Sequence, residues 1–188
     1  HLFHTDRLIF NPFETEDLLP LKECLNHPEL AGRRYTPWEL SPDMPLTTPQ
    51  VEFLLKEWRE AEKSIHLTIK RLPDQQFIGY AEANWEWDPH CTFLCLVIHP
   101  DHQRQGYGSE TLQFLLDYLF NQTATHNISC WLSDWNSAGY AFALKHGFLE
   151  CGRSRREGLR RGAYYDEIVV DLLRPEWQKQ RGGNNHGT

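Results

Sequence analysis

The stretch from residue 96 to residue 109 reads LVIHPDHQRQGYGS, and it decides the fold. An apolar run leads into a polar turn with two glycines, and leucines at helical spacing follow the turn. Glycines in a strand-to-helix turn let the backbone approach a ligand and adopt conformations barred to other residues. The N–H groups and the dipole of the helix start favour an anion, above all a pyrophosphate. The alternative is a structural glycine turn that binds nothing.

Outward from this stretch, segments of period 2 alternate with segments of period 3.6. The pattern predicts strands at residues 7–13, 64–71, 76–87, 92–98, 128–132, 148–155 and 164–173, and helices at 14–26, 48–63, 109–121 and 136–146. We expect an α/β (α+β) fold with a central, mixed, mostly antiparallel sheet of about seven strands and helices on both faces. A single domain over residues 1–177 and a flexible tail over 178–188 are expected.

A second segment, residues 136–148, has the features of a capped helix. Asn136 is a good N-cap, and Gly147 is the residue expected just past a helix end, with Phe148 entering the core. A dinucleotide fold is the competing interpretation of the glycine turn. However, residues 106–108 lack the third glycine of G-x-G-x-x-G, and their strand follows a meander instead of opening a βαβ unit.

These two segments resemble the two signatures of the GNAT superfamily of N-acetyltransferases. Gln103, Gly106 and Gly108 stand at the fixed positions of its [Gln/Arg]-x-x-Gly-x-[Gly/Ala] motif, and Asn136 opens the second motif. The resemblance implies a GNAT fold with acetyl-CoA as cosubstrate and no metal. Its pyrophosphate would lie on the turn, and Asn136 would contact the pantetheine arm. The implied cofactor-binding residues are Leu96, Val97, Ile98, Gln103, Arg104, Gln105, Gly106, Tyr107, Gly108, Ser109 and Asn136.

The two ends of the chain resemble one branch of the superfamily more loosely. Residues 5–8 and 164–177 are similar to the ribosomal-protein N-terminal-alanine acetyltransferases. That branch also includes enzymes that act on small amines, amino acids and antibiotics. The resemblance therefore implies a primary amine as acceptor, either a protein N-terminus or a small molecule, without choosing between them.

Direct attack of an amine on a thioester requires a base for the amine proton. Glu82 is the candidate base, because a carboxylate within the apolar run 78–83 would have a raised pKa; the alternative is an outward-facing strand residue. Many family members take an acid for the leaving thiolate from a Tyr seven residues after the signature Asn. Ala143 stands there in this chain, and Tyr140 lies one turn earlier on the same helix face. Tyr140 is predicted either to be this acid or to pack on the cofactor or the core.

Aromatic residues are predicted near the substrate mouth by the same resemblance, and they would attract a cation. They are Tyr35, Trp38, Trp85 and Trp87. Core or dimer packing is the alternative, and a homodimer is expected to be possible. The basic cluster between Arg153 and Arg161 either meets an acidic partner or belongs to a solvated hairpin.

Composition limits the class of protein. The net charge of −7 disfavours nucleic-acid binding, and it either attracts a cationic substrate or only keeps the protein soluble. No apolar run reaches the length of a membrane span, and no signal peptide is visible. The five cysteines are expected to be free thiols in a reducing, cytoplasmic compartment. The alternative to an active enzyme is a catalytically weak acyl-CoA-binding or regulatory module, which Ala143 favours.

Overall fold

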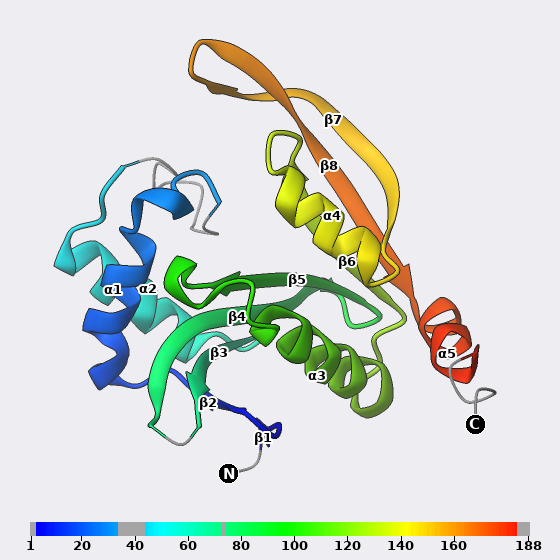
Figure 1. The fold of residues 1–188 in the computed structure, drawn as a ribbon, viewed down its shortest axis with the longest axis horizontal. Coiled ribbons are helices and arrows are strands. Elements are labelled where there is room, and N and C mark those ends of the chain that lie inside the picture. Colours follow the sequence, from blue (N-terminus) through cyan, green and yellow to red (C-terminus); the bar gives the residue numbers. More distant parts are fainter. Residues whose placement is uncertain (1–2, 34–43, 73, 184–188) are drawn as a thin grey trace. The chain divides into compact units, whose positions relative to one another are not determined.

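The structure is a computed structural model that describes residues 3–33, 44–72 and 74–183 (Figure 1). The chain divides into two compact units. Unit 1 comprises His1–Glu86 and Cys95–Tyr118, and unit 2 comprises Trp87–Leu94 and Leu119–Thr188. Each unit buries apolar side chains of its own.

The described residues form a mixed, mostly antiparallel sheet with helices (Figure 1). The strands are β1 (Phe3–His4), β2 (Leu8–Pro12), β3 (Ser64–Arg71), β4 (Gln76–Asp88), β5 (Cys91–Ile98), β6 (Asn127–Ser133), β7 (Leu149–Arg160) and β8 (Ala163–Leu173). The helices are α1 (Leu18–Leu25), α2 (Thr48–Glu60), α3 (Tyr107–Gln122), α4 (Ser137–Lys145) and α5 (Arg174–Gly183), with 3-10 turns η1 (Thr15–Asp17), η2 (Pro28–Leu30) and η3 (Pro100–His102). Hydrogen-bonded neighbours follow the order β1-β2-β3-β4-β5-β6-β8-β7. The predicted fold class is confirmed. The described residues form eight strands where about seven were expected, because two-residue β1 is too short to show a period.

Unit 1 is built on the antiparallel strands β1 to β4, with α1 and α2 packed against each other and α2 against β3. Apolar residues of α1, α2, β4 and β5 form its core, among them Leu21, Leu54, Tyr80 and Val97. A nearly buried ion pair, Lys70 to Asp17 at 2.7 Å, joins β3 to η1. The apolar residues that recur with helical spacing in α1 and α2 therefore face the same core as the apolar residues of the strands.

Gly79 on β4 lies against the backbone of β5. A Cβ at this position would lie 2.2 Å from the carbonyl oxygen of Val97, next to the bond from the His99 N–H to the Ile78 carbonyl. Gly79→Ala is expected to lower the free energy of unfolding by about 2 kcal/mol, because packed backbone must move. Urea unfolding measures this, and Gly152→Ala is the matched control, since nothing lies within 4 Å of its Cβ. Equal stability of the two variants would contradict the prediction.

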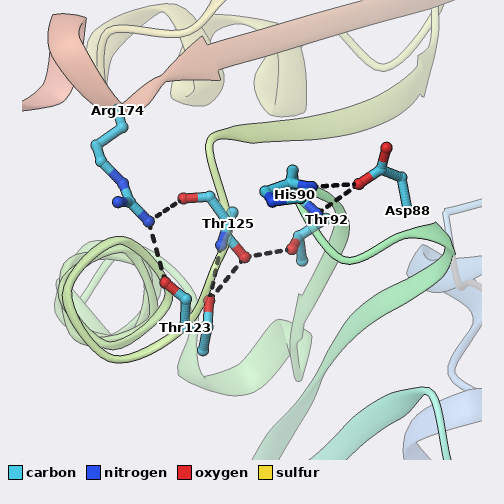
Figure 2. Close-up of polar contacts among 6 residues, drawn as sticks. All are labelled: Asp88, His90, Thr92, Thr123, Thr125 and Arg174. Carbon is cyan, nitrogen blue, oxygen red and sulfur yellow. Dashed lines mark hydrogen bonds and ion pairs between the residues drawn. The ribbon is translucent and has the colours of Figure 1, made fainter.

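Unit 2 contains β6, β8 and β7 in antiparallel pairing, and the first residues of β5 pair in parallel with β6. Figure 2 shows how its last helix is anchored. Arg174 donates to the carbonyls of Thr123 and Thr125, and the hydroxyls of Thr125 and Thr92 are 2.7 Å apart. Trp177 packs on Phe120 in the same unit. Helix α5 continues to Gly183, so residues 178–183 of the expected flexible tail 178–188 are helical, and residues 184–188 lie outside the described part of the chain.

Candidate functional site

The predicted anion turn lies in unit 1, between β5 and α3. Gln103 donates from its side-chain amide to the carbonyl of Ile98 at 2.9 Å, which closes the turn onto the end of the strand. Arg104 and Gly106 both have positive φ, 60° and 85°. Residues 103–106 are exposed, whereas Tyr107 is buried. The prediction that a glycine is needed here for its backbone conformation is confirmed at Gly106.

Helix α3 begins immediately after the turn. The N–H of Glu110 donates to the carbonyl of Gly106 at 3.0 Å, which is the first turn of the helix. The N–H groups of the first turn of an α-helix have no partner within the helix, and the helix dipole is positive at this end. This is an arrangement that suits a phosphate, and exposed Gly106 adds no side chain that would cover it.

An arginine that the sequence analysis did not single out supports the turn. Arg7 forms a two-pronged contact with Glu110 on α3, with Nε and Nη2 at 2.7 and 2.6 Å from the carboxylate oxygen Oε2. Its Nη1 donates to the carbonyl of Gln105 at 3.1 Å, and its guanidinium lies 4.7 Å from the ring centre of Tyr107. Arg7 belongs to the segment 5–8, which the sequence analysis used only for the resemblance to one branch of the superfamily. The sequence therefore pointed to this segment but assigned no function to Arg7.

Glu82 lies on β4 in unit 1 and is 5% exposed. Burial raises its pKa to about 7, and a hydrogen bond from Asn84 opposes this shift only in part. No ion pair to Glu82 occurs among the residues that the structure describes. The sequence left two interpretations of Glu82 open. Its burial excludes an outward-facing strand residue and agrees with a buried carboxylate whose pKa is raised to about 7.

His66 is the cross-strand neighbour of Glu82, and the sequence did not point to it. His66 on β3 stands directly opposite Glu82 in the antiparallel register, so both side chains lie on one face of the sheet. Burial lowers the pKa of His66 to about 4, and its ring stacks on Trp58 at 5.1 Å. At neutral pH the neighbour of Glu82 is therefore an uncharged imidazole, so no positive charge on His66 lowers the pKa of Glu82.

The second signature lies in unit 2. The side-chain oxygen of Asn136 accepts the N–H of Gly139 at 3.2 Å, as predicted for an N-cap. A Cβ on Gly139 would lie 2.6 Å from Asn136 Nδ2, so this glycine makes room for the cap. At the other end of α4, Gly147 has a φ of 87° and Phe148 donates to the carbonyl of Ala143, which confirms the predicted helix end.

Tyr140 also lies on α4, and its hydroxyl is engaged. It donates to Glu150 Oε2 at 2.8 Å, while Arg153 donates to the other carboxylate oxygen of Glu150 at 2.6 Å. The hydrogen bond to Glu150 raises the pKa of Tyr140. Ala143, at the position where many family members have Tyr, is buried. Both roles predicted for Tyr140, acid and packing residue, stay predictions, and in this structure its hydroxyl proton is hydrogen-bonded to Glu150.

We expect Tyr140→Phe to change kcat by less than about threefold, because a hydroxyl held by a carboxylate is a poor proton donor. Steady-state release of free thiol from acetyl-CoA at pH 7.5 measures this. Ala143→Tyr, in the same helix, is the companion variant, since it restores the family's usual side chain. A loss of about 100-fold in Tyr140→Phe would show that the hydroxyl does act as the acid.

The four predicted substrate aromatics are only partly described. Tyr35 and Trp38 lie outside the described residues. Trp85 and Trp87 are both on β4; Trp85 is half-buried, and Trp87 is 97% exposed. Their substrate role stays a prediction, but the exposure of Trp87 excludes core packing for that residue.

Two arginines of the basic cluster between Arg153 and Arg161 contact other residues of unit 2. Arg153 pairs with Glu150, and the Arg160 guanidinium lies 3.6 Å from the ring centre of Trp135. These contacts favour the hairpin interpretation.

All five cysteines are free thiols, as expected. In the described part of the chain no group of three or more His, Cys, Asp or Glu could hold a metal, and no helix there is both long and apolar enough to cross a membrane.

A sequence model of the acetyltransferase (GNAT) family matches residues 32–148, which is more than half of the chain. The chain belongs to the GNAT acetyltransferase family. It is similar to the uncharacterized N-acetyltransferase YoaA of Bacillus subtilis, with 23% identity over 93% of this chain and 97% of that protein. It is also similar to the uncharacterized prophage-derived N-acetyltransferase YokL of the same organism, with 25% identity over 68% of this chain and 74% of the relative.

Solved structures show the same fold. A GNAT-family acetyltransferase from Bacillus anthracis aligns with a TM-score of 0.77 at 18% identity, covering 92% of this chain and 98% of the other. The spermidine N-acetyltransferase of Vibrio cholerae, solved with CoA and spermine, aligns with a TM-score of 0.78 at 19% identity, covering 93% and 99%. GNAT enzymes use acetyl-CoA, so acetyl transfer is the activity of the family. The ribosomal-protein branch is not confirmed, since the structural neighbours include spermidine acetyltransferases.

Proposed function

We propose that the protein transfers an acetyl group from acetyl-CoA to a primary amine, with the pyrophosphate of the cosubstrate on the turn before α3. The observation that carries this is the turn itself. Arg104 and Gly106 adopt positive φ at the start of a sixteen-residue helix, and Gly106 is exposed. Main-chain N–H groups at such a helix start bind a phosphate without needing a cationic side chain. The cofactor-binding residues predicted from the sequence are part of this proposal.

Glu82 is the proposed base. When bound, acetyl-CoA supplies the thioester whose carbonyl carbon the amine attacks, and the C–S bond breaks as the C–N bond forms. An aliphatic ammonium has a pKa near 10, so a carboxylate with a pKa of about 7 accepts its proton far better than an ordinary one at about 4.5. Glu82 takes this proton directly or through water and passes it to solvent.

The leaving thiolate needs less assistance. A thiol has a pKa near 8.5, so its anion leaves without full protonation. The buried methyl of Ala143 offers no proton, and the hydroxyl of Tyr140 is bound to Glu150. The chemistry of this chain would then depend on the base and on cofactor positioning more than on an acid.

The acceptor is proposed to be a small or exposed cationic amine. The net charge of −7 raises the local concentration of cations, and a structural neighbour is a spermidine acetyltransferase. Polyamines and protein N-termini both satisfy this description. Both belong in the first assay, and we expect the protein to act in the cytoplasm.

Free-thiol release from acetyl-CoA tests the proposal against a panel of spermidine, spermine, peptides with N-terminal Ala, Ser or Met, aminoglycosides and free amino acids. Turnover with one class, with mass spectrometry showing one added acetyl group, would establish the reaction and the acceptor class together. Binding of CoA without turnover on any amine would remove the catalytic part. Absence of CoA binding would refute the proposal as a whole.

A second candidate function is an acyl-CoA-binding or regulatory module. Ala143 and the Tyr140–Glu150 bond favour it, because both remove a source of protons for the thiolate. The raised pKa of Glu82 speaks against it, since a pure binding module has no use for a buried carboxylate near neutrality. The same assay separates the two candidates.

A further inference from the structure

We propose that Arg7 is a positioning residue of the anion turn, which fixes the direction of a phosphate-binding N–H group through the carbonyl of Gln105. The inference rests on the proposed binding of acetyl-CoA. Arg7 comes from the loop before β2, far from the turn in sequence, yet its Nη1 donates to the Gln105 carbonyl at 3.1 Å. It therefore contacts the turn directly and acts on the cosubstrate through the backbone.

The peptide bond between Gln105 and Gly106 explains how this contact can act. A peptide unit is planar and trans, so its C=O and N–H point in opposite directions. When Arg7 holds the Gln105 carbonyl on one side, the N–H of Gly106 must face the other. Gly106 has a φ of 85° and no side chain, so without this contact its peptide has unusual freedom to rotate. Arg7 removes that freedom before the ligand arrives.

Arg7 also compensates a charge that would oppose an anion. Glu110 stands in the first turn of α3, and its carboxylate accepts from Arg7 Nε at 2.7 Å. Burial raises the pKa of Glu110, but hydrogen bonds from Thr5 and Arg7 outweigh burial and the pKa lies below its ordinary value. Glu110 is thus ionised at neutral pH beside the helix start. Without Arg7 this negative charge would repel a phosphate.

The arginine is itself held firmly. Thr5 donates its hydroxyl to Glu110 Oε1 at 2.5 Å, and the same hydroxyl accepts the N–H of Leu8. The Arg7 N–H also donates to Glu110, and the Arg7 carbonyl accepts the N–H of Leu72. The guanidinium covers the ring of Tyr107 and lies 3.2 Å from where a Cβ of Gly106 would be. A side chain fixed on so many sides can hold the turn rigidly.

Calorimetric titration with CoA alone tests the inference. Arg7→Ala is expected to raise the Kd by about 10-fold or more, because a charge-assisted hydrogen bond is lost and Glu110 is left uncompensated. Arg7→Lys should fall between, since an ammonium cannot hold Glu110 and the Gln105 carbonyl in one plane. Adding Glu110→Gln to Arg7→Ala should recover part of the loss. Arg59→Ala is the matched control, since Arg59 is also a partly exposed arginine of unit 1, and its carboxylate partner is Glu14.

A purely structural role for Arg7 would lower the melting temperature but leave the Kd of the folded protein unchanged. Hydrogen exchange without ligand gives a second readout, in which the amides of residues 104–109 should exchange faster in Arg7→Ala than in Arg59→Ala. Wild-type binding with an unchanged Kd in Arg7→Ala would overturn the inference and leave the proposed function standing. If wild-type protein bound no CoA, the proposed function would fail and this inference with it.

Discussion

Glu82→Gln is expected to lower kcat/KM for the amine by about 100-fold or more at pH 8, the loss typical of a missing general base. Glutamine keeps the shape of the side chain and can still accept from Asn84, which donates to Glu82 at 3.3 Å. It cannot take a proton from an ammonium. Because the change is nearly isosteric in a site that is 5% exposed, the loss can be attributed to chemistry and not to packing.

The pH profile carries the sharper signature. Glu82 acts as a base only when ionised, so kcat/KM of the wild type should rise with pH through about 7, the pKa of Glu82. In Glu82→Gln this rise should vanish, and only the ionisation of the amine near pH 10 should remain. Rates measured from pH 5.5 to 9.5 with one amine would show whether the contribution of the group with a pKa of about 7 is present in the wild type and absent in Glu82→Gln.

The same substitution, which should lower the rate, should raise the free energy of unfolding at pH 8. The pKa of Glu82 is raised in the folded state, so its favourable contribution is complete below about pH 4.5 and is lost as the pH rises through about 7. At pH 8 the wild type bears the cost of a buried ionised carboxylate, on the order of 3 kcal/mol for a shift from 4.5 to about 7. Glu82→Gln should therefore gain stability relative to the wild type between pH 4.5 and pH 8.

Glu167→Gln is the matched control for both measurements. Burial, together with the charges of Glu157 and Asp134, also raises the pKa of Glu167, which is half-buried on β8. A stability gain in both variants with a rate loss only in Glu82→Gln would isolate the base. If Glu82→Gln kept the alkaline rise and Glu167→Gln lost it, the base would be Glu167 instead.

The sequence predicted the fold and the turn because both depend on local rules. Glycine at a positive φ, an N-cap at Asn136 and apolar periodicity are properties of a few consecutive residues, and all three are present. Short or weakly periodic elements could not be predicted from local patterns. The two-residue β1 has no measurable period. Helix α5 has few apolar residues besides Trp177, so no helix was predicted there and its residues 178–183 were assigned to the tail.

Pairings between distant residues could not be predicted in this way. Arg7 meets Glu110 and Gln105 because β2 and the start of α3 come together in unit 1, a contact that no local pattern encodes. The sequence could not decide whether the Glu82 side chain is buried or faces outward, since a shift of one residue in the strand register moves a side chain to the other face of the sheet. Likewise Tyr140 was correctly placed on its helix, but its partner Glu150 lies on strand β7.

Gly106→Trp is expected to raise the Kd for CoA by at least about 100-fold, or to abolish measurable binding. Two effects combine in this variant. A φ of 85° costs an ordinary residue about 1–2 kcal/mol. In addition, a Cβ would lie 3.2 Å from the guanidinium of Arg7, so the indole must either displace Arg7 or extend over the exposed helix start. Either result covers or distorts the N–H groups that the phosphate would need.

Two further variants separate strain from obstruction. Gly106→Ala keeps the unfavourable φ but adds only a methyl group, so its Kd should rise much less than that of the tryptophan variant. Gly162→Trp adds the same indole at a φ of 78°, in the turn between β7 and β8, where nothing lies within 4 Å of the Cβ. Gly162→Trp should lose some stability and keep its affinity for CoA. Wild-type affinity in Gly106→Trp would mean that the phosphate lies elsewhere, because a main-chain site cannot tolerate an indole at its centre.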